Sequence, residues 1–599
     1  MIKEEIVKLL ETALKKMRVN PVTTSLRSKH FHDHSLMNTH LSLGSHPELS
    51  GYGVKDIVVT VETPANSIHG DYSSNLALKL TKTLKKNPFL IAQEIVKFLP
   101  KSSLIEKVEV IKPGFINFWT AKNSLYDSLD NFVKGSFNFP NVNLGQNKKI
   151  MVEFAHPNTH KLFHIGHLRN ISTGEAIVRI LEATGNEIIR TNYQGDVGLH
   201  IAKCFWAIKR LIKEKGDKSI LEKDLTKKIK LLGKAYSTGQ LAYENSETDK
   251  QEIIEINRQI YDQKIKILDL WTMTRQWSLD YFNEIYKRVY SHFDRCYFES
   301  EMNRSVEISQ NLLKQKILEK SQGAIIFNGK KYGVDTRVFI NSLGFPTYEG
   351  KELALAEKEF VDFGELDKCI HVVTPEQTSF FKVTFKVEEI IDKVKYGNRQ
   401  FHLAYEWVKL KKGKMSSRTG NIIEAEWLLD EIKKQIRKKF KNTPEVEEIL
   451  AVASAKYSFL KNSTDKAIAF DINESISLEG NSAPYLIYTY VRTRSILGKN
   501  LINPEVTYPK QLSDEEKNIL RLIYQYPQIV AKSATDLAPN VIANYLFELS
   551  QQFNSFYQKC PILKAPEDKK YLRLQITKAV GQIIKNGLYL LGIKTVEKM

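Results

Sequence analysis

The spacing of hydrophobic residues predicts a small mixed domain at the start of the chain. Residues 2–17 carry Ile and Leu at intervals of three and four, the pattern of an amphipathic helix that packs by one face. Residues 56–64 have a strand-like pattern, residues 75–100 contain two helical segments separated by a proline, and residues 108–120 contain two strands about a Pro-Gly turn. We therefore expect an α+β domain over residues 1–120.

A strand, a helix and a second strand follow a connecting stretch at residues 121–147. Residues 149–154 (KIMVEF) form a short β-rich run, residues 167–185 have helical spacing and end in glycine, and residues 186–193 are again strand-like. In an open α/β sheet built from such units, ligands bind beyond the carboxyl ends of the strands, where the first loop meets its helix. The passage VEFAHPNTHKLFHIGHLRN at residues 152–170 occupies that place.

The remaining pattern predicts a long helical insertion and a helical C-terminal domain. Residues 200–295 are lysine-rich and helical, strand patterns return between residues 323 and 373, and none persists beyond residue 425. The expected fold class is α/β, with a Rossmann-like domain over residues 148–424 and an all-α helical bundle over residues 425–599.

Composition adds a preference for a polyanionic partner. The chain of 599 residues has a formal net charge of +19, which favours nucleic acid, although solvated lysine faces also produce such a charge. Cys204, Cys296, Cys369 and Cys560 are scattered without metal-ligand spacing, which fits a reducing cytoplasm. No apolar run is long enough to span a bilayer and the first helix is no signal peptide, so we expect a cytoplasmic protein without membrane contact.

A polar stretch at residues 22–51 holds five histidines. Their alternation suggests a metal site, but no cysteine or carboxylate cluster accompanies them, and a polar loop is the favoured interpretation. The histidines are His30, His32, His34, His40 and His46.

The histidines at the start of the helix expected over residues 167–185 suit a nucleoside triphosphate. A helix N-terminus attracts phosphate through unpaired N–H groups and the positive end of the helix dipole. His164 and His167 add side-chain donors there, and Gly166 between them allows a base or ribose to approach the backbone. The passage has neither the GxxxxGK[ST] nor the GxGxxG pattern, so neither common nucleotide motif explains it.

A second motif lies far downstream, in KLKKGKMSSRTGN at residues 409–421. Lysines, glycines and small hydroxyl residues in one loop suit a mobile cationic clamp that stabilises triphosphate charge as pyrophosphate departs. The two motifs together indicate nucleotide chemistry much more strongly than either alone.

With HIGH at residues 164–167 and KMSSR at residues 414–418, the chain resembles the class I aminoacyl-tRNA synthetases, whose second motif is KMSKS. TNYQGDVGLHIA, GFPTYEGKELALA and HVVTPEQTSFFK narrow the resemblance to arginyl-tRNA synthetases, from HGDYSSNLALKL near the N-terminus to LEGNSAPYLIYTYVRTRSIL in the helical tail. The resemblance implies ATP-dependent activation of L-arginine, with Mg²⁺ carried by ATP and no dedicated metal site. The arginyl group then passes to the 3′-terminal ribose of tRNA(Arg), and the first step usually needs bound tRNA.

The resemblance also assigns the nucleotide site. It implies catalytic roles for the HIGH residues, for Lys161 and for the loop lysine, with these ATP-binding residues: His164, Gly166, His167, Lys414, Met415 and Ser416. The loop lacks the second lysine of the common pattern, because Arg418 stands there. In such family members a lysine ahead of HIGH often supplies the missing charge, and Lys161 stands at that place, where a solvated loop lysine is the alternative.

An arginine pocket follows from the same resemblance. Tyr348 and Gln377 are implied for the guanidinium end of the substrate, and Glu153 and Asn158 for its α-amino and carboxylate end. An aromatic face and acceptors in the plane suit a guanidinium. Glu352 stands where the family commonly has Asp, one methylene shorter.

The helical tail mixes cations with tyrosines, as a reader of RNA loops requires. We expect tRNA contacts from Tyr488, Arg492, Arg494, Lys438 and Lys439, although tyrosines at this spacing also suit a helical core. The family resemblance makes this bundle the anticodon-binding domain and the N-terminal domain the reader of the tRNA elbow.

Three other functions stay open. They are a class I synthetase for another amino acid, a catalytically silent tRNA-binding paralogue, and a small-molecule ligase with the same HIGH loop. Tyr348, Glu352 and Gln377, an unlikely lining for an apolar side chain, and the absence of metal-ligand cysteines argue against the first. The intact motifs argue against the second, and the helical tail argues against the third. A monomer is expected, because no long coiled coil is present.

Overall fold

The computed structural model describes the chain as two compact units. The first contains Met1–Gly135, Asn503–Tyr524 and Gln558–Ile576, and the second contains the rest. The described residues are 2–17, 19, 58–64, 67–135, 143–144, 147–215, 224–261, 265–411, 423–498 and 507–599. The histidine-rich stretch at residues 22–51 and the heart of the lysine loop at residues 412–422 lie outside them.

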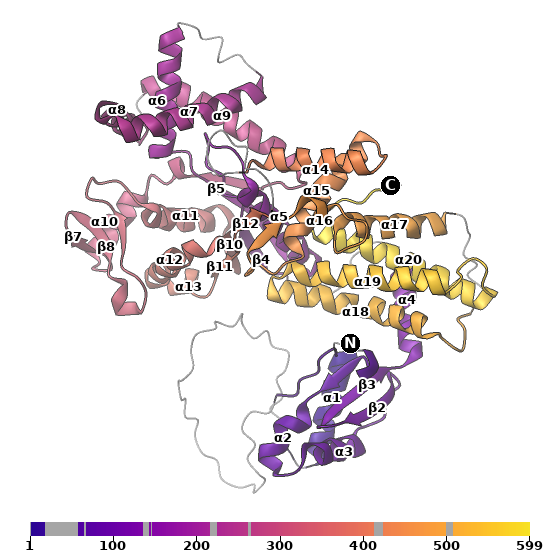
Figure 1. The fold of residues 1–599 in the computed structure, drawn as a ribbon. Helices are drawn as coiled ribbons and strands as arrows, with labels where there is room; N and C mark the ends of the chain where they lie inside the picture. Colours follow the sequence, from indigo (N-terminus) through magenta and orange to yellow (C-terminus); the bar gives the residue numbers. More distant parts are fainter. Residues whose placement is uncertain are drawn as a thin grey trace, which may run out of the picture. The chain divides into compact units, whose positions relative to one another are not determined.

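The first unit has the α+β fold that the sequence predicts. Three helices, α1 (Ile2–Lys16), α2 (Leu76–Leu84) and α3 (Pro88–Phe98), pack against a three-stranded antiparallel sheet of order β1-β3-β2 (Figure 1). The strands are β1 (Tyr72–Ser74), β2 (Ile105–Ile111) and β3 (Phe115–Thr120), and α4 (Lys122–Lys134) follows them. The strand expected at residues 56–64 is reduced to one bridge between Glu62 and Ser73, because its described part has no second strand partner.

A parallel sheet of order β11-β10-β4-β5-β6 forms the centre of the second unit. The predicted strand, helix and strand are β4 (Lys149–Glu153), α5 (Ile165–Ala183) and β5 (Glu187–Gln194), which confirms the Rossmann-like unit. The other strands are β6 (Arg295–Phe298), β10 (Lys368–Val373) and β11 (Gln400–Ala404). Glycine at position 174 lets α5 pack closely on this sheet, because a Cβ there would lie 2.3 Å from the ring of Phe154.

In the described part of the predicted insertion, four helices lie together at the top of the second unit in Figure 1. They are α6 (Leu199–Lys215), α7 (Leu225–Asn245), α8 (Glu247–Tyr261) and α9 (Ile265–Arg288).

Of the strands expected between residues 323 and 373, the last is β10 of the parallel sheet, as the sequence predicts, but the earlier ones do not extend that sheet. They belong to a separate antiparallel sheet of β7 (Glu319–Ser321), β8 (Ala324–Phe327) and β9 (Arg337–Ile340), since their short connections permit hairpins but not parallel crossovers. The helices around them are α10 (Ser305–Lys314), α11 (Tyr348–Phe363), α12 (Thr378–Ile391) and α13 (Lys393–Tyr396).

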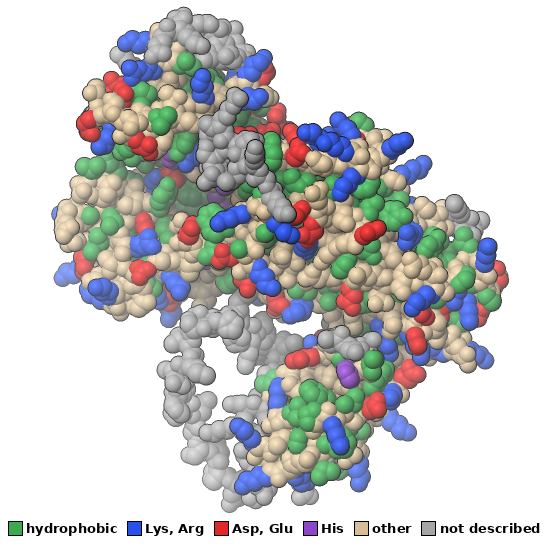
Figure 2. All heavy atoms as spheres, viewed as in Figure 1, with side chains coloured by type: hydrophobic (Ala, Val, Ile, Leu, Met, Phe, Trp, Pro, Cys, Tyr) green, Lys and Arg blue, Asp and Glu red, His purple; other side chains and the backbone are tan. Residues whose placement is uncertain are grey.

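Within its described residues, the C-terminal region is helical apart from one strand that the sequence analysis missed. β13 (Ile468–Phe470) pairs in parallel with β12 (Val408–Leu410), and three residues are too few to show a period. The helices are α14 (Ala425–Lys439), α15 (Pro444–Leu460), α16 (Ile472–Ser475), α17 (Ala483–Leu497), α18 (Asp514–Asp536), α19 (Pro539–Lys559) and α20 (Glu567–Leu590). Figure 2 shows Lys and Arg side chains gathered over α14.

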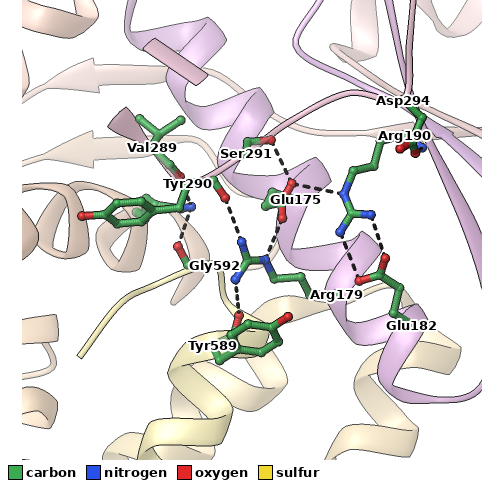
Figure 3. Close-up of polar contacts among 11 residues, drawn as sticks. Glu175, Arg179, Glu182, Arg190, Val289, Tyr290, Ser291, Asp294, Tyr589 and Gly592 are labelled. Atoms are coloured by element: carbon green, nitrogen blue, oxygen red, sulfur yellow. Dashed lines mark hydrogen bonds and ion pairs between the residues drawn. The ribbon is translucent and has the colours of Figure 1, made fainter. Parts of the chain in front are cut away.

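A buried polar network fastens the second half of α5 to the chain around it (Figure 3). Glu175 accepts from Arg179 Nε at 2.6 Å and from Ser291 Oγ at 2.8 Å, and Arg190 Nε lies 3.6 Å away. Arg190 also forms a bidentate ion pair with Glu182, at 2.7 and 3.1 Å.

The same network reaches the turn at residues 589–592, called the C-terminal turn below. Arg179 donates to the carbonyls of Tyr290 and Tyr589, at 2.8 and 3.2 Å. Lys456, fully buried on α15, donates to the carbonyls of Val289 and Gly592, at 2.8 and 2.7 Å. Burial and the nearby Arg179 lower the pKa of Lys456 to about 7. The helix that begins at HIGH is therefore held by cations that also bind the end of the chain.

Candidate active site

The HIGH residues form a reciprocal cap at the start of α5. The backbone N–H groups of Gly166 and His167 donate to Nδ1 of His164, at 3.1 and 3.4 Å. The backbone N–H of His164 donates in turn to Nδ1 of His167, at 3.2 Å, and the two rings stack with centroids 3.7 Å apart. The two imidazoles thus accept the backbone N–H groups that serine and glutamate side chains accept in an ordinary capping box.

This cap fixes the protonation of both rings. Each Nδ1 accepts a hydrogen bond, so each neutral ring carries its proton on Nε2 and offers it as a donor. Burial first, and then Lys161, lowers the pKa of His164 to about 4. Burial and His164 hold the pKa of His167 well below its usual value. Two neutral donors with fixed tautomers therefore stand at a helix N-terminus, where phosphate oxygens bind.

Glycine at position 166 has a packing reason beside the ligand approach that the sequence suggests. A Cβ there would lie 2.9 Å from Cε1 and 3.0 Å from Nδ1 of His164. The missing side chain makes room for the His164 ring, which could not otherwise accept the backbone N–H groups.

The segment after the lysine loop lies directly against the HIGH residues. Ile165 donates its backbone N–H to the carbonyl of Ile423, and Ala425 donates to the carbonyl of Phe163, both at 2.9 Å. His164 and Glu424 form an isolated antiparallel bridge. Lys414, Met415 and Ser416 themselves lie outside the described residues. The residues that directly follow the loop therefore lie against HIGH, although about 250 residues separate the two motifs in the sequence.

Lys161 lies beside the cap rather than free in solvent. Its Nζ stands 5.1 Å from the centroid of the Tyr236 ring, and its charge acts on His164. Burial and the charge of Lys203 lower its pKa. The charged form of a partly buried ammonium group beside another cation is stabilised by an anionic ligand.

Glu153 and Asn158 lie at the start of the loop between β4 and α5 and within it, respectively. Glu153, at the carboxyl end of β4, is buried, and its Oε1 lies 3.1 Å from Nδ1 of His371. Burial would raise the pKa of Glu153, but the bond to His371 lowers it. Asn158 lies against Gly195, just beyond the end of β5.

The three residues expected at the guanidinium end differ in exposure. Tyr348 begins α11 and is 61% exposed, and Gln377, just before α12, is also exposed. Glu352, one turn into α11, is buried, and burial raises its pKa to about 8. A cation beside Glu352 would favour its ionised form.

The sequence analysis missed a second carboxylate in this region. Glu299, just after β6, is buried and forms an ion pair of 2.7 Å with Lys351, which also donates to the Tyr261 hydroxyl at 3.0 Å. Glu299 Oε1 lies 3.5 Å from the place that a Cβ on Gly195 would take, the glycine that Asn158 also contacts. The sequence signal that could have identified Glu299 is the position of its carboxylate directly after a strand of the sheet.

The residues expected to contact RNA fall into three environments. Lys438 and Lys439 are exposed on α14. Arg492 lies between the rings of Tyr488 and Tyr557, with centroid distances of 4.9 and 5.1 Å, while Arg494 pairs with Glu597 at 2.9 Å. The neighbouring Tyr490, by contrast, is a core residue, as the alternative interpretation of these tyrosines expects for some of them.

Two absences hold for the described part of the chain. No three His, Cys, Asp or Glu side chains within it are grouped so that they could hold a metal ion. No helix there has the length and apolar content that crossing a membrane requires.

The buried histidines predict a loss of stability in mild acid. Burial lowers the pKa of His160 and His200 to about 3, so both bind a proton more readily when unfolded, and stability falls as pH drops below about 6.5. The side chain of His160 is fully buried between Thr159 and Thr274. Its protonation on unfolding alone lowers the free energy of unfolding by about 2 kcal/mol between pH 7 and pH 5. Melting temperatures across this pH range should fall less steeply for His160→Gln than for the natural chain, and parallel curves would contradict the assignment.

Comparison with known families agrees with this geometry. An arginyl tRNA synthetase N terminal domain model matches residues 41–119, a class I (R) tRNA synthetase catalytic domain model matches residues 132–462, and a DALR anticodon binding domain model matches residues 486–599. The chain is thus a class I aminoacyl-tRNA synthetase.

Whole-chain comparison gives the particular family. The arginine–tRNA ligase of Bdellovibrio bacteriovorus is 32% identical over 564 residues, which cover 91% of this chain and 95% of that protein. The Borrelia duttonii arginine–tRNA ligase is also 32% identical, with the same coverage. The chain belongs to the arginyl-tRNA synthetases.

Solved structures show the same fold. The Thermus thermophilus arginyl-tRNA synthetase matches with a TM-score of 0.78 at 22% identity, over 100% of both chains. The Plasmodium falciparum enzyme matches with a TM-score of 0.77 at 20% identity, over 100% of this chain and 99% of that one.

Proposed function

We propose that this member of the family, an arginine–tRNA ligase, activates L-arginine with ATP at the carboxyl edge of its parallel sheet. The arginine carboxylate attacks the α-phosphate, pyrophosphate leaves, and the adenylate then passes its arginyl group to a hydroxyl of the 3′-terminal ribose of tRNA(Arg). Both steps depend on positioning and electrostatics and need no protein nucleophile. Mg²⁺ enters with ATP.

One observation carries the proposal for the nucleotide. The backbone bonds between Phe163–Ile165 and Ile423–Ala425 bring the capped start of α5 next to the residue that follows the lysine loop. Two neutral imidazoles at a helix N-terminus can donate to phosphate oxygens without adding a charge that would have to be released. Lys161 and the loop residues Lys414, Met415 and Ser416 complete the triphosphate site in this proposal.

The arginine substrate lies, in our proposal, between the sheet and the start of α11. Glu153 binds its α-ammonium group, and Asn158 its carboxylate end. The free Oε2 of Glu153 supports this role, because it is buried and has no hydrogen-bond partner among the described residues. Tyr348, Gln377 and Glu352 receive the guanidinium, whose charge would lower the raised pKa of Glu352.

tRNA binds, we propose, along the helical region and the N-terminal domain. The exposed Lys438 and Lys439 contact backbone phosphates, and Tyr488 with Arg492 and Arg494 contacts the anticodon loop, where stacking surfaces and cations act together. The protein works in the cytoplasm as a monomer, with residues 1–120, 148–424 and 425–599 as its three domains.

Charging of total tRNA with each labelled amino acid in turn tests this function. With ATP and Mg²⁺ present, we expect charging with arginine alone, and exchange of pyrophosphate into ATP that requires added tRNA. Charging with another amino acid would overturn the arginine assignment. RNA binding without any charging would identify a silent paralogue, and adenylate formation without transfer to tRNA a small-molecule ligase.

A further inference from the structure

A buried histidine lies behind the carboxylate that we assign to the substrate's ammonium group. His371 on β10 is paired in register with Glu153 on β4, and both side chains are almost fully buried. His371 Nδ1 lies 3.1 Å from Glu153 Oε1, and its Nε2 lies 2.9 Å from Oε1 of Gln400 on β11. Both ring nitrogens therefore contact oxygen atoms.

The contact between Gln400 and Glu388 decides whether Nε2 of the His371 ring is protonated. Gln400 Nε2 donates to Glu388 Oε2 at 2.9 Å, so its carbonyl oxygen is the atom that faces His371 and it can only accept. Nε2 of the ring must then carry a proton. When Glu153 is ionised, Nδ1 must carry another and the ring is an imidazolium, whereas a protonated Glu153 would donate to a neutral ring, so the charges around the pair decide between the two states.

The charges in this part of the core favour the ionised pair of His371 and Glu153. Glu352, Glu359 and Glu388 are buried around the same ring, and no hydrogen-bond partner appears among the described residues for either oxygen of Glu359. Burial raises the pKa of Glu352 and of Glu388 to about 8, and it raises that of Glu359 well above its usual value. Burial alone would lower the pKa of His371, but Glu153 and the other carboxyls raise it to about 10.

One cation among four carboxyls can keep only one of them ionised at neutral pH. The hydrogen bond selects Glu153. That bond uses Oε1 and leaves Oε2, which is buried and has no partner in the described part of the chain.

We propose that His371 is a positioning residue, whose imidazolium holds Glu153 as an oriented carboxylate with one oxygen free for the α-ammonium group of arginine. The inference rests on the proposed role of Glu153. Without the imidazolium, Glu153 is a buried glutamic acid among others, and it is neutral at the pH at which its neighbours are neutral.

The groups that face His371 come from every element around it. Titratable neighbours are Glu153 on β4, His156 after it, Glu352 and Glu359 on α11, Glu388 on α12 and His402 on β11. Burial lowers the pKa of His156 and brings that of His402 to about 4, so neither imidazole replaces His371 as a cation near pH 7.

The test is the pH dependence of the KM for arginine in His371→Gln, a substitution that keeps a donor and removes the charge. In the natural chain we expect Glu153 to stay ionised, with no Glu153 titration in this KM between pH 6 and pH 8.5. In the variant, Glu153 binds a proton as pH falls, and the KM should rise roughly tenfold for each unit below its new pKa. The KM for ATP and kcat at pH 8.5 should stay within about twofold, since the charge acts only on the substrate's ammonium group.

His402→Gln is the matched control, because His402 is the in-register neighbour of His371 on the next strand and bonds to the Val373 carbonyl instead. Its profile should parallel that of the natural chain. 5-Guanidinopentanoate, which is arginine without its α-amino group, should inhibit the natural chain and His371→Gln equally at every pH. A pH-independent rise in KM, or equal weakening of both ligands, would show that His371 only fills space.

A measurement on the natural chain covers the case in which the variant does not fold. In a spectrum of ¹⁵N-labelled histidine at pH 8.5, one imidazole should have both nitrogens protonated. Absence of such a signal would overturn the inference. Failure of the natural chain to charge arginine at all would instead refute the proposed function.

Discussion

Replacing His167 with alanine is expected to slow arginine charging roughly 100- to 1,000-fold, with little change in the KM for ATP. The substitution removes one of two neutral imidazole donors at the start of α5 and leaves the backbone N–H of His164 without its acceptor. A donor that meets developing phosphate charge acts mainly in the transition state, so kcat carries the loss.

Single-turnover charging with saturating ATP and tRNA measures this effect directly. His292→Ala is the control, since His292 is exposed and precedes β6, so its loss should leave the rate unchanged. A fall in the melting temperature with an unchanged rate would mean that His167 is only a helix cap.

Because the pKa of His164 is lowered to about 4, the charging rate of the natural chain should show no titration of this ring between pH 6 and pH 8.

The largest expected effect on stability comes from Glu175→Gln, at about 3–5 kcal/mol. Glu175 is fully buried and is the anion that balances Arg179 and Arg190, with buried Lys456 nearby (Figure 3). Glutamine keeps the shape and one oxygen acceptor, but the cations lose their counter-charge in a place that water does not reach. Loss of about 4 kcal/mol would speed local hydrogen exchange roughly 1,000-fold in the second half of α5 and in the C-terminal turn.

Glu182→Gln is the matched comparison on the same helix. Glu182 pairs bidentately with the same Arg190, but 36% of its side chain is exposed, so its loss should cost about 1 kcal/mol or less. Equal exchange rates in the two variants would show that burial of the charge is not what makes Glu175 important.

Much of the nucleotide site was open to prediction from the sequence because its parts are local. The apolar run of β4, the helical spacing of α5 and the two histidines at its start lie within about 35 residues. Caps and periodicity depend on near neighbours, so HIGH could be assigned to a helix N-terminus before any tertiary contact was known. The packing of the His164 ring against Gly166 was missed, because the rings of the cap fold back on that glycine only in three dimensions.

The helical region shows where such prediction ends. Tyr488 and Tyr490 lie two residues apart on α17, yet Tyr488 is exposed beside Arg492, while Tyr490 is buried and donates to Glu597. The difference depends on which elements pack against each face. β13 was missed for a similar reason, since its partner β12 lies about 60 residues earlier.

By itself, the sequence determined the α/β class, the position of the HIGH turn, the helical tail and the resemblance to arginyl-tRNA synthetases. Only the tertiary structure decided which charges meet. His371 reaches Glu153 because two strands 218 residues apart pair in parallel and in register. Glu299 meets Lys351, and Glu175 meets Arg190, by the same kind of long-range packing. Periodicity is a property of neighbouring residues, whereas the ionisation of a buried carboxyl depends on every group folded around it.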